Sequence, residues 1–207
     1  ALIAEGALGQ KTGFGIYRND GKQIRVFDQR IRAYRDCRDS SDEIAPEVMA
    51  ILKNRSPAGK FAQLRACNHP QARFLWALFR DVFHYVAFHL ADIADNARDL
   101  DLAMRWGYGW AQGPFETWQS AGWQSIADAV QADIDADRAM STAALPAWVF
   151  ARVEHGGVHR SEGSYSARGG TIKPPSTLPV YRRQLFPDRV LGEGANSSVM
   201  SGTTIWE

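Results

Sequence analysis

Apolar residues recur at helical spacing through most of the central part of the chain. The longest run covers residues 70–95, where large apolar side chains form one wide stripe: Phe74, Leu75, Leu78, Phe79, Val82, Phe83, Val86 and Leu90. Asn68 is placed to cap this helix, and Pro70 fits its first turn. Because other helices have to cover a stripe of this width, the pattern predicts a helical assembly.

Shorter segments repeat the helical pattern on both sides of this run. A helix capped by Ser41 or Asp42 is expected to end near residue 54, and another covers about residues 58–67. Residues 123–139 predict a later helix with isoleucine and valine on one face and aspartates on the other. We therefore expect short helices to surround the long one.

The pattern changes toward the N-terminus. Residues 1–6 resemble the last turn of a helix stopped by Gly6. Residues 14–18 and 23–27 predict two short strands joined by an Asn-Asp-Gly-Lys turn. The basic stretch 28–38 spreads its charges around a helix, so we interpret it as a solvated connector.

Glycine and proline dominate the pattern toward the C-terminus. Residues 147–153 are compatible with one more helical segment. Beyond them, every periodic run is interrupted, so residues 154–195 are predicted to be extended and rich in turns, with short strands at best. The fold class expected for the whole chain is mainly α, a helical bundle with a short N-terminal β-hairpin and an irregular C-terminal extension.

The stretch from Asp99 to Trp123 carries the most information about function. It predicts a helix broken by glycines, an aromatic-rich loop, and a second helix opened by Pro114. The pattern Asp101-x-Ala-Met-x-x-Gly-x-Gly-x-x-x-Gly113-Pro-Phe115 resembles the helical C-terminal domain of NAD-dependent 3-hydroxyacyl-CoA dehydrogenases of fatty-acid β-oxidation. Residues 8–17, Leu-Gly-Gln-Lys-Thr-Gly-Phe-Gly-Ile-Tyr, resemble the sequence that closes the same domain.

The two motifs occur here in reversed order, which resembles the tandem copies of long, multifunctional members of that family. The division expected from this likeness has four parts: residues 1–27, the end of a first helical copy with the hairpin; 28–68, a connector with short helices; 69–153, a second helical copy; and 154–207, an extended linker toward a downstream domain. The chain is thus expected to be a fragment of a larger protein.

The resemblance implies that the chemistry lies elsewhere in that larger protein. In the family, a Rossmann domain binds NAD and carries a histidine–glutamate pair, and both would precede Ala1. An asparagine that the first helical copy offers to the acyl-CoA substrate would fall near Trp76 in this copy. We therefore expect no catalytic, cofactor-binding or metal-binding residue in this chain. The chain would instead support the first helical copy by packing against it, and a homodimer is a further possible partner arrangement. The residues expected to form the packing surface are Trp106, Trp110, Phe115 and Trp118.

Bulk properties narrow the alternatives. With a formal net charge of +1, the chain lacks the strongly basic surface that nucleic-acid binding needs. The two cysteines, Cys37 and Cys67, are too few for a disulfide framework and fit a cytoplasmic protein with free thiols. No apolar run is long enough to cross a membrane. A helical protein-interaction module without an enzymatic parent remains the alternative. A helix-turn-helix DNA binder ranks last, because residues 115–127 contain no lysine or arginine.

Other candidate chemistry is weaker. Gln10 stands where a phosphate-binding P-loop needs glycine. His155, His159 and Glu162 could hold zinc only if their glycine-rich loop were ordered, and Ser164 lacks the second glycine of a nucleophile elbow. For all of these residues we favour core or surface roles.

Overall fold

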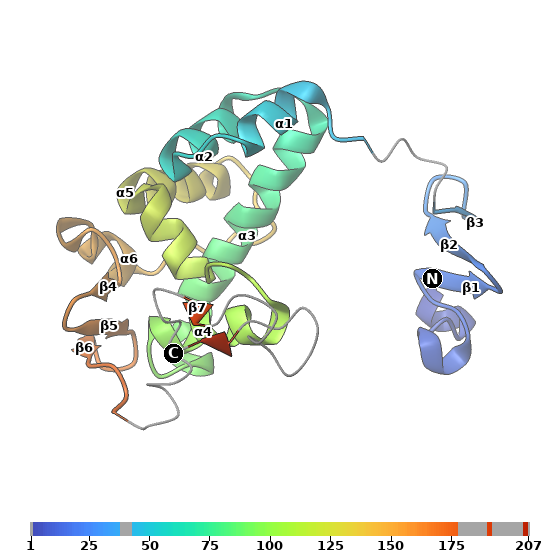
Figure 1. Ribbon diagram of the computed structural model, residues 1–207. Coiled ribbons are helices and arrows are strands. Elements are labelled where there is room, and N and C mark those ends of the chain that lie inside the picture. The colour runs from blue at the N-terminus through green and yellow to red at the C-terminus, as the bar shows by residue number, and fades with distance from the viewer. Residues whose placement is uncertain (1, 38–42, 178–189, 192–204, 207) are drawn as a thin grey trace. The chain divides into compact units, whose positions relative to one another are not determined.

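The computed structural model describes residues 2–37, 43–177, 190–191 and 205–206. The chain divides into two units, Ala1–Met49 and Ala50–Glu207, which are described separately (Figure 1). The predicted caps Ser41 and Asp42 lie outside the described residues, as does most of the chain beyond residue 177. Helices predominate among the described elements, so the prediction of a mainly α fold is confirmed.

The N-terminal unit contains two short 3-10 helices and a three-stranded sheet. The helices η1 (Leu2–Glu5) and η2 (Gln10–Thr12) precede the antiparallel strands β1 (Tyr17–Asp20), β2 (Gln23–Asp28) and β3 (Ala33–Asp36). The predicted hairpin is confirmed. Asp20 pairs with Gln23, and Gly21 has a φ of 67°, which suits glycine in a tight turn.

The stretch 28–38, predicted to be a solvated connector, contains a strand, because Ala33–Asp36 forms β3 against β2. Asp28 accepts a hydrogen bond from the backbone N–H of Arg30 and pairs with Arg35 at 3.1 Å, which closes the turn between β2 and β3. The ring of Tyr34 lies edge-on to Phe27 at 5.4 Å. The charged side chains of this stretch are therefore not spread around a helix. Asp28 of β2 and Arg35 of β3 form an ion pair between neighbouring strands.

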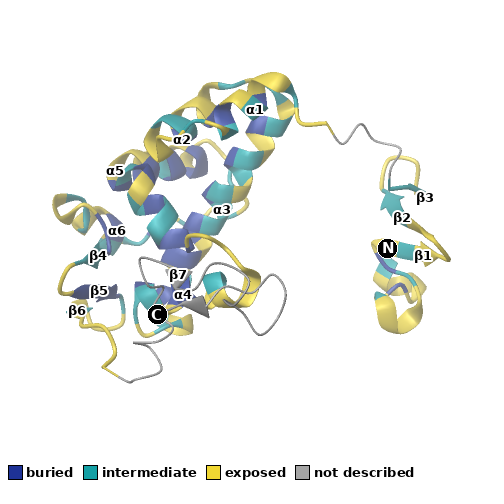
Figure 2. Ribbon diagram, viewed as in Figure 1, coloured by how far each residue is buried: buried dark blue, intermediate teal, exposed yellow. Residues whose placement is uncertain are grey.

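The second unit is a helical body. Its helices are α2 (Pro57–Ala66), α3 (Pro70–Ile93), α4 (Ala97–Tyr108), α5 (Pro114–Asp135) and α6 (Ala147–Ala151), while α1 (Pro46–Leu52) spans the border between the units. Buried residues are concentrated where α2, α3 and α5 contact one another (Figure 2). His69 rather than Asn68 caps α3, since its Nδ1 accepts from the N–H of Gln71 at 3.2 Å.

Aromatic rings fill the centre of this body. Phe83 of α3 lies 5.8 Å from Phe61 of α2 and 5.3 Å from Trp118 of α5, measured between ring centroids. Trp118 stacks on Trp123 at 4.4 Å across Gly122, whose φ and ψ of 100° break α5 at that point. The kink turns two tryptophans of one helix toward each other.

The segment after residue 153 is not simply an extended linker. After the 3-10 turn η3 (Val153–His155), strands β4 (His159–Arg160), β5 (Gly163–Ser166) and β6 (Thr171–Lys173) form an antiparallel sheet, and β5 contacts α4. Gly156, Gly157 and Gly170, which lie between these elements, all have positive φ. These glycines make the turns that the sequence pattern could not distinguish from a linker. Farther on, β7 (Val190–Leu191) pairs with β8 (Ile205–Trp206).

Candidate functional site at the corner between α4 and α5

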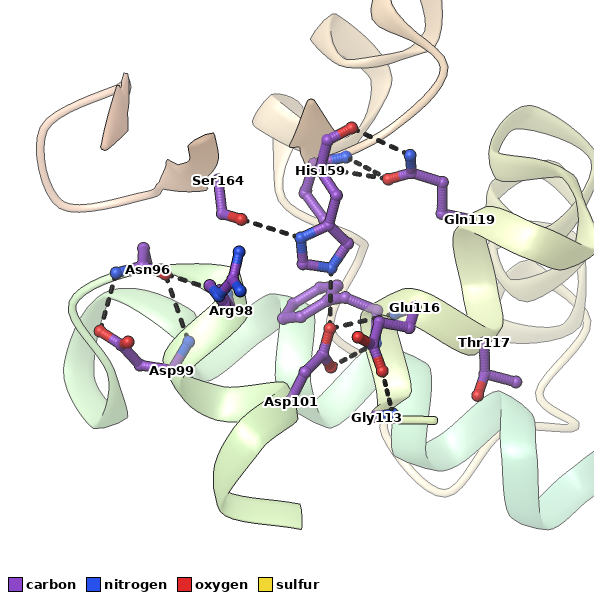
Figure 3. Close-up of polar contacts among 12 residues, drawn as sticks. Asn96, Arg98, Asp99, Asp101, Gly113, Glu116, Thr117, Gln119, His159 and Ser164 are labelled. Carbon is purple, nitrogen blue, oxygen red and sulfur yellow. Dashed lines mark hydrogen bonds and ion pairs between the residues drawn. The ribbon is translucent and has the colours of Figure 1, made fainter. Parts of the chain in front are cut away.

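Asp101 of α4 caps the start of α5. The residue at the N-cap position is Gly113, which has no side chain to accept hydrogen bonds. The Asp101 carboxylate does so instead, from the N–H of Phe115 at 2.8 Å and of Glu116 at 3.1 Å (Figure 3). Pro114 has no N–H, and that of Thr117 donates to the carbonyl of Gly113. Asp101, a residue of another helix, therefore accepts from the N–H groups of Phe115 and Glu116, the two in the first turn of α5 that have no acceptor within the helix.

Gly113 is required because Asp101 approaches so closely. A Cβ on Gly113 would lie 2.3 Å from the Cβ and 2.4 Å from the Cα of Asp101, distances that real Cβ atoms do not show. Gly109 ends α4 with a φ of 69° in the left-handed region. The spacing of aspartate and glycines that carried the family resemblance thus describes one tight helix–helix corner.

Glu116 completes the corner from the side of α5. One of its oxygens accepts from the N–H of Gly113 at 2.8 Å, and the other pairs with Arg105 of α4 at 2.8 Å. Glutamate at this third position of a helix is the usual partner in a capping box. Here the cap is shared between Asp101 and Glu116, so both helices contribute to it.

His159 connects this corner to the C-terminal sheet. Its Nε2 lies 2.7 Å from Oδ2 of Asp101, and its Nδ1 lies 2.9 Å from Oγ of Ser164 on the neighbouring strand (Figure 3). Gln119 of α5 holds the backbone of the same strand, accepting from the N–H groups of Val158 and His159 and donating to the carbonyl of His159. Side chains from both helices therefore fix β4 in place.

Burial dominates the electrostatics of Asp101, whose exposed fraction is 1%. Loss of water raises the pKa of its carboxyl group above the usual value, and the hydrogen bond and charge of His159 oppose this effect without cancelling it. Both contacts of the His159 ring are satisfied when Ser164 Oγ–H donates to Nδ1 and Nε2–H donates to Asp101.

The serine–histidine–aspartate order resembles a nucleophilic triad, but its surroundings differ from those of an active site. Ser164 is 3% exposed, and the Asp101 carboxylate is already occupied by the two backbone N–H groups of α5. A catalytic serine has to reach its substrate and the groups that stabilise an oxyanion. We therefore interpret the cluster as the joint that holds α4, α5 and the C-terminal sheet together.

A second buried cluster lies inside the helical body. Asp133 of α5 accepts from Trp76 Nε1 at 2.8 Å and pairs with Arg80 at 3.2 Å and with Arg138 at 2.6 Å. Burial alone would raise the pKa of Asp133, but the hydrogen bonds from Arg138, Trp76 and Arg80 outweigh it and lower the pKa below its usual value. Trp76, placed near the family's substrate asparagine by sequence, is thus a buried partner of Asp133.

The four predicted packing residues separate into two pairs. Phe115 and Trp118 are both 0% exposed, so in this structure they belong to the internal core of the helical body. They are buried because α5 turns its aromatic face toward α3 and α6. Trp106 and Trp110 are 45% and 36% exposed, and their role against another part of a larger protein stays a prediction.

Among the described residues, no group of three or more histidine, cysteine or acidic side chains is arranged to hold a metal ion. Sequence reasoning missed Gln119 and, although it named His159 and Ser164, it did not connect them with each other or with Asp101. A usable signal existed, because a two-residue turn after Arg160 makes His159 and Ser164 direct cross-strand partners. Over the described part of the chain, no helix is long and apolar enough to span a bilayer.

Comparison with known proteins agrees with the motif resemblance. The chain is 28% identical over 171 residues to a probable 3-hydroxyacyl-CoA dehydrogenase of Bacillus subtilis (strain 168), an alignment that covers 83% of this chain and 20% of that protein. It is 25% identical over 131 residues to a putative fatty acid oxidation complex trifunctional enzyme of Rickettsia felis (strain ATCC VR-1525 / URRWXCal2), covering 60% of this chain and 16% of that protein.

The chain therefore spans about a fifth of the length of these curated relatives or less. No family model matches it, and no solved structure does. Proteins named for 3-hydroxyacyl-CoA dehydrogenation and fatty acid oxidation are thus its curated relatives, as the motifs predicted.

Proposed function

We propose that the chain is part of an NAD-dependent 3-hydroxyacyl-CoA dehydrogenase of fatty-acid β-oxidation in the cytoplasm, which converts 3-hydroxyacyl-CoA to 3-oxoacyl-CoA. Within that enzyme, residues 50–207 act as a helical support module with no catalytic residue of their own. The observation that supports the proposal most is the similarity over 83% of the chain to a protein named as a probable 3-hydroxyacyl-CoA dehydrogenase.

The corner between α4 and α5 supports a structural rather than a catalytic role. Asp101 caps α5, Gly113 permits the close approach of the two helices, and Phe115 fills the core. None of these three groups is left exposed for a substrate. NAD and the acyl-CoA would accordingly be bound by a preceding Rossmann domain and a first helical copy of the longer protein.

A support of this kind acts on catalysis through rigidity. Hydride transfer needs the donor and the acceptor held in near-attack geometry, and small displacements of a cleft wall reduce the rate strongly. Covering an apolar helical wall also removes it from water at about 25 cal/mol per Å². Trp106 and Trp110 lie at the end of α4 and just after it, and both side chains are partly exposed. In this proposal they contact the first helical copy.

Kinetics of the whole protein test the proposal. The protein encoded by the complete reading frame is expected to reduce NAD with a 3-hydroxyacyl-CoA substrate, and replacing both Trp106 and Trp110 by alanine should lower kcat more than it changes KM. Tyr108→Ala serves as the matched control, since Tyr108 lies in the same turn and is 74% exposed.

Two results would contradict the proposal. One is a whole protein that reduces no NAD with any 3-hydroxyacyl-CoA, which would favour a helical interaction module instead. The other is clear calorimetric binding of NAD by the 207-residue chain alone, because a support module should have no site for the cofactor.

A further inference from the structure

The glycine-rich motif of residues 8–17 forms a tightly bonded loop in the N-terminal unit. Thr12 Oγ1 accepts from the N–H of Leu8 at 2.9 Å and donates to the carbonyl of Gly9 at 3.1 Å. Gly15 lies so close to Gly9 that a Cβ on Gly15 would be 2.9 Å from the Cα of Gly9. Contacts within the motif therefore fix the shape of this loop.

The loop forms one wall of an open hollow of about 1290 Å³ within the N-terminal unit. The other walls come from η1 and from the turn between β2 and β3. Its apolar lining is mostly aliphatic: Leu2, Ile3, Leu8, Ile16, Tyr17 and Phe27. Four of these side chains, Ile3, Leu8, Ile16 and Tyr17, are each at least 60% exposed. Concave apolar surface of this kind is the usual form of a site for a small ligand.

Arg32 is the one cation among the residues that line this hollow. Its φ of 52° lies in the left-handed region, which a residue with a side chain rarely adopts. Backbone of this kind is found more often at sites that bind a ligand than elsewhere. Within the described part of the chain, Arg32 forms no ion pair, whereas Arg35 on the following strand is paired with Asp28. The guanidinium of Arg32 is therefore available to an anion at the hollow.

The charge of the N-terminal unit also favours an anionic ligand. Residues 2–37 contain seven lysines and arginines and four acidic residues. Asp20 and Asp28 are each paired with an arginine, and Glu5 is the one acid that lines the hollow. A molecule with an anionic head and an apolar tail would match both features, because its tail would cover the apolar lining and its head would meet the positive charge.

We propose that the hollow binds a free carboxylic acid with an alkyl chain, which lies against Leu8 and Ile16 while the carboxylate pairs with Arg32. The aliphatic lining suits a flexible alkyl chain better than a flat ring. A guanidinium matches a carboxylate through two parallel hydrogen bonds. The ligand differs from the acyl-CoA of the proposed reaction, because a thioester leaves no carboxylate at the head of the chain.

This inference does not depend on the reaction proposed above. The hollow belongs to the N-terminal unit, whereas the residues proposed to brace the first helical copy, Trp106 and Trp110, belong to the helical body. The chain would bind the acid whether or not the longer protein is a dehydrogenase, so the two proposals can fail separately.

Calorimetric titration of the 207-residue chain with decanoate tests the proposal. We expect one site with a Kd of about 10–100 μM, a range that suits a ligand of this size. The alcohol 1-decanol and the cation decyltrimethylammonium carry the same chain with a neutral and a positive head, and they should bind progressively more weakly. No binding of decanoate, or equal affinity for all three molecules, would overturn the inference.

Substitutions at the hollow separate its apolar and charged parts. Ile16→Asp should raise the Kd for decanoate about tenfold or more, because it places a like charge in the apolar lining. Arg32→Gln should raise it up to about fivefold, as loss of an exposed ion pair does, and should abolish the preference for decanoate over 1-decanol. Ile24→Asp is the matched control, since Ile24 is 54% exposed in the same unit but lies outside the hollow. An unchanged Kd in both Ile16→Asp and Arg32→Gln would contradict the proposal.

Nuclear magnetic resonance of the isotope-labelled chain locates the site. Decanoate should shift the amide signals of Gly9, Gly15 and Ile16, whereas shifts confined to the exposed apolar residues of α3 would overturn the inference. The same signals show whether each variant keeps its fold, and Leu8→Asp replaces Ile16→Asp if the latter unfolds.

Titration of the complete protein distinguishes a ligand site from a surface that the longer protein covers itself. Decanoate should bind there too, and Arg32→Gln should weaken it by a similar factor. If the 207-residue chain bound decanoate and the complete protein did not, a segment of the longer protein would occupy the hollow and the proposal would be wrong.

Discussion

The N-terminal unit and the helical body differ in what they do with apolar residues. In the described residues before α1, Ala7 is the one buried hydrophobic residue, while Ile3, Leu8, Ile16 and Ile31 are each more than 60% exposed. The body instead buries whole aromatic side chains from three helices, including Phe83, Phe115 and Trp118. Both regions have regular hydrogen-bonded structure, so hydrogen bonding does not distinguish them.

This contrast indicates where stability arises. The N-terminal unit spans Ala1–Met49, and units of this size bury so little surface that a disulfide, a metal or a partner usually has to stabilise them. Cys37 is a free thiol, so no disulfide supports the N-terminal sheet. We infer that its apolar face depends on contacts from outside the unit, whereas the body carries its own core.

The largest expected effect in this comparison is that of Trp118→Ala. The side chain is fully buried, packs between Phe83 and Trp123, and donates its indole N–H to the carbonyl of Trp123 at 2.9 Å. Truncation should cost about 3–5 kcal/mol, as for other large aromatic deletions in cores. Denaturant unfolding of the 207-residue chain measures it, and a loss below about 1 kcal/mol would mean that the body has no tight core.

Gly113→Ala should have the next largest effect, because it disturbs the corner that joins α4 to α5. The new Cβ would overlap the backbone of Asp101, so the carboxylate has to withdraw from the N–H groups of α5. Overpacking and the lost cap together predict about 2–4 kcal/mol in thermal or denaturant unfolding.

Gly107→Ala provides the matched control for this corner. Gly107 lies in α4, and a Cβ added there would meet no other atom within 4 Å, so alanine should be neutral or slightly stabilising. Equal losses for the two glycines would show that backbone freedom, and not the approach of Asp101, determines the result.

The corner also shows what sequence could and could not predict. The two helices and Pro114 at the start of α5 follow from local signals, and they are confirmed. That Asp101 would supply the cap missing at Gly113 depends on a contact between two helices on either side of a loop, which no local pattern contains. His159 is more distant still, 58 positions from Asp101, so its role required the folded chain.

The errors near the two ends have a related cause. Charged or glycine-rich sequences were interpreted as connectors because they lack an apolar period. In both β3 and the sheet from β4 to β6, short strands are defined instead by turns: Asp28 with Arg30 in one case, and glycines of positive φ in the other. Strands of two to four residues are too short for periodicity to reveal.

A pH-dependent comparison should give a smaller effect. Because the native pKa of Asp133 is lowered, its contribution to stability is present above the unfolded pKa of about 3.9 and is lost as pH falls through the native value. Asp133→Asn should therefore cost about 1–3 kcal/mol at neutral pH, and this difference should shrink in acid.

Urea unfolding at several pH values measures the difference. Asp128→Asn, on the exposed side of the same helix, is the control and should change stability little at any pH. If the deficit of Asp133→Asn stayed constant down to the lowest pH at which the chain folds, the ion pairs with Arg80 and Arg138 would not be the source of its stability.

The smallest effect should come from the N-terminal unit, and it gives the sharpest comparison because the same substitution can be made in both regions. Ile24 of β2 is 54% exposed, whereas Ile126 of α5 is 1% exposed. Ile24→Thr keeps a β-branched side chain on a strand and removes little buried surface, so the loss should stay within about 0.5 kcal/mol. Ile126→Thr places a hydroxyl in the core and should cost about 2 kcal/mol or more. The same two variants can be compared in the complete protein. If Ile24→Thr there cost nearly as much stability as Ile126→Thr, Ile24 would belong to a face that another segment covers. A small loss in both the 207-residue chain and the complete protein would contradict the inference that this strand depends on contacts from outside its unit.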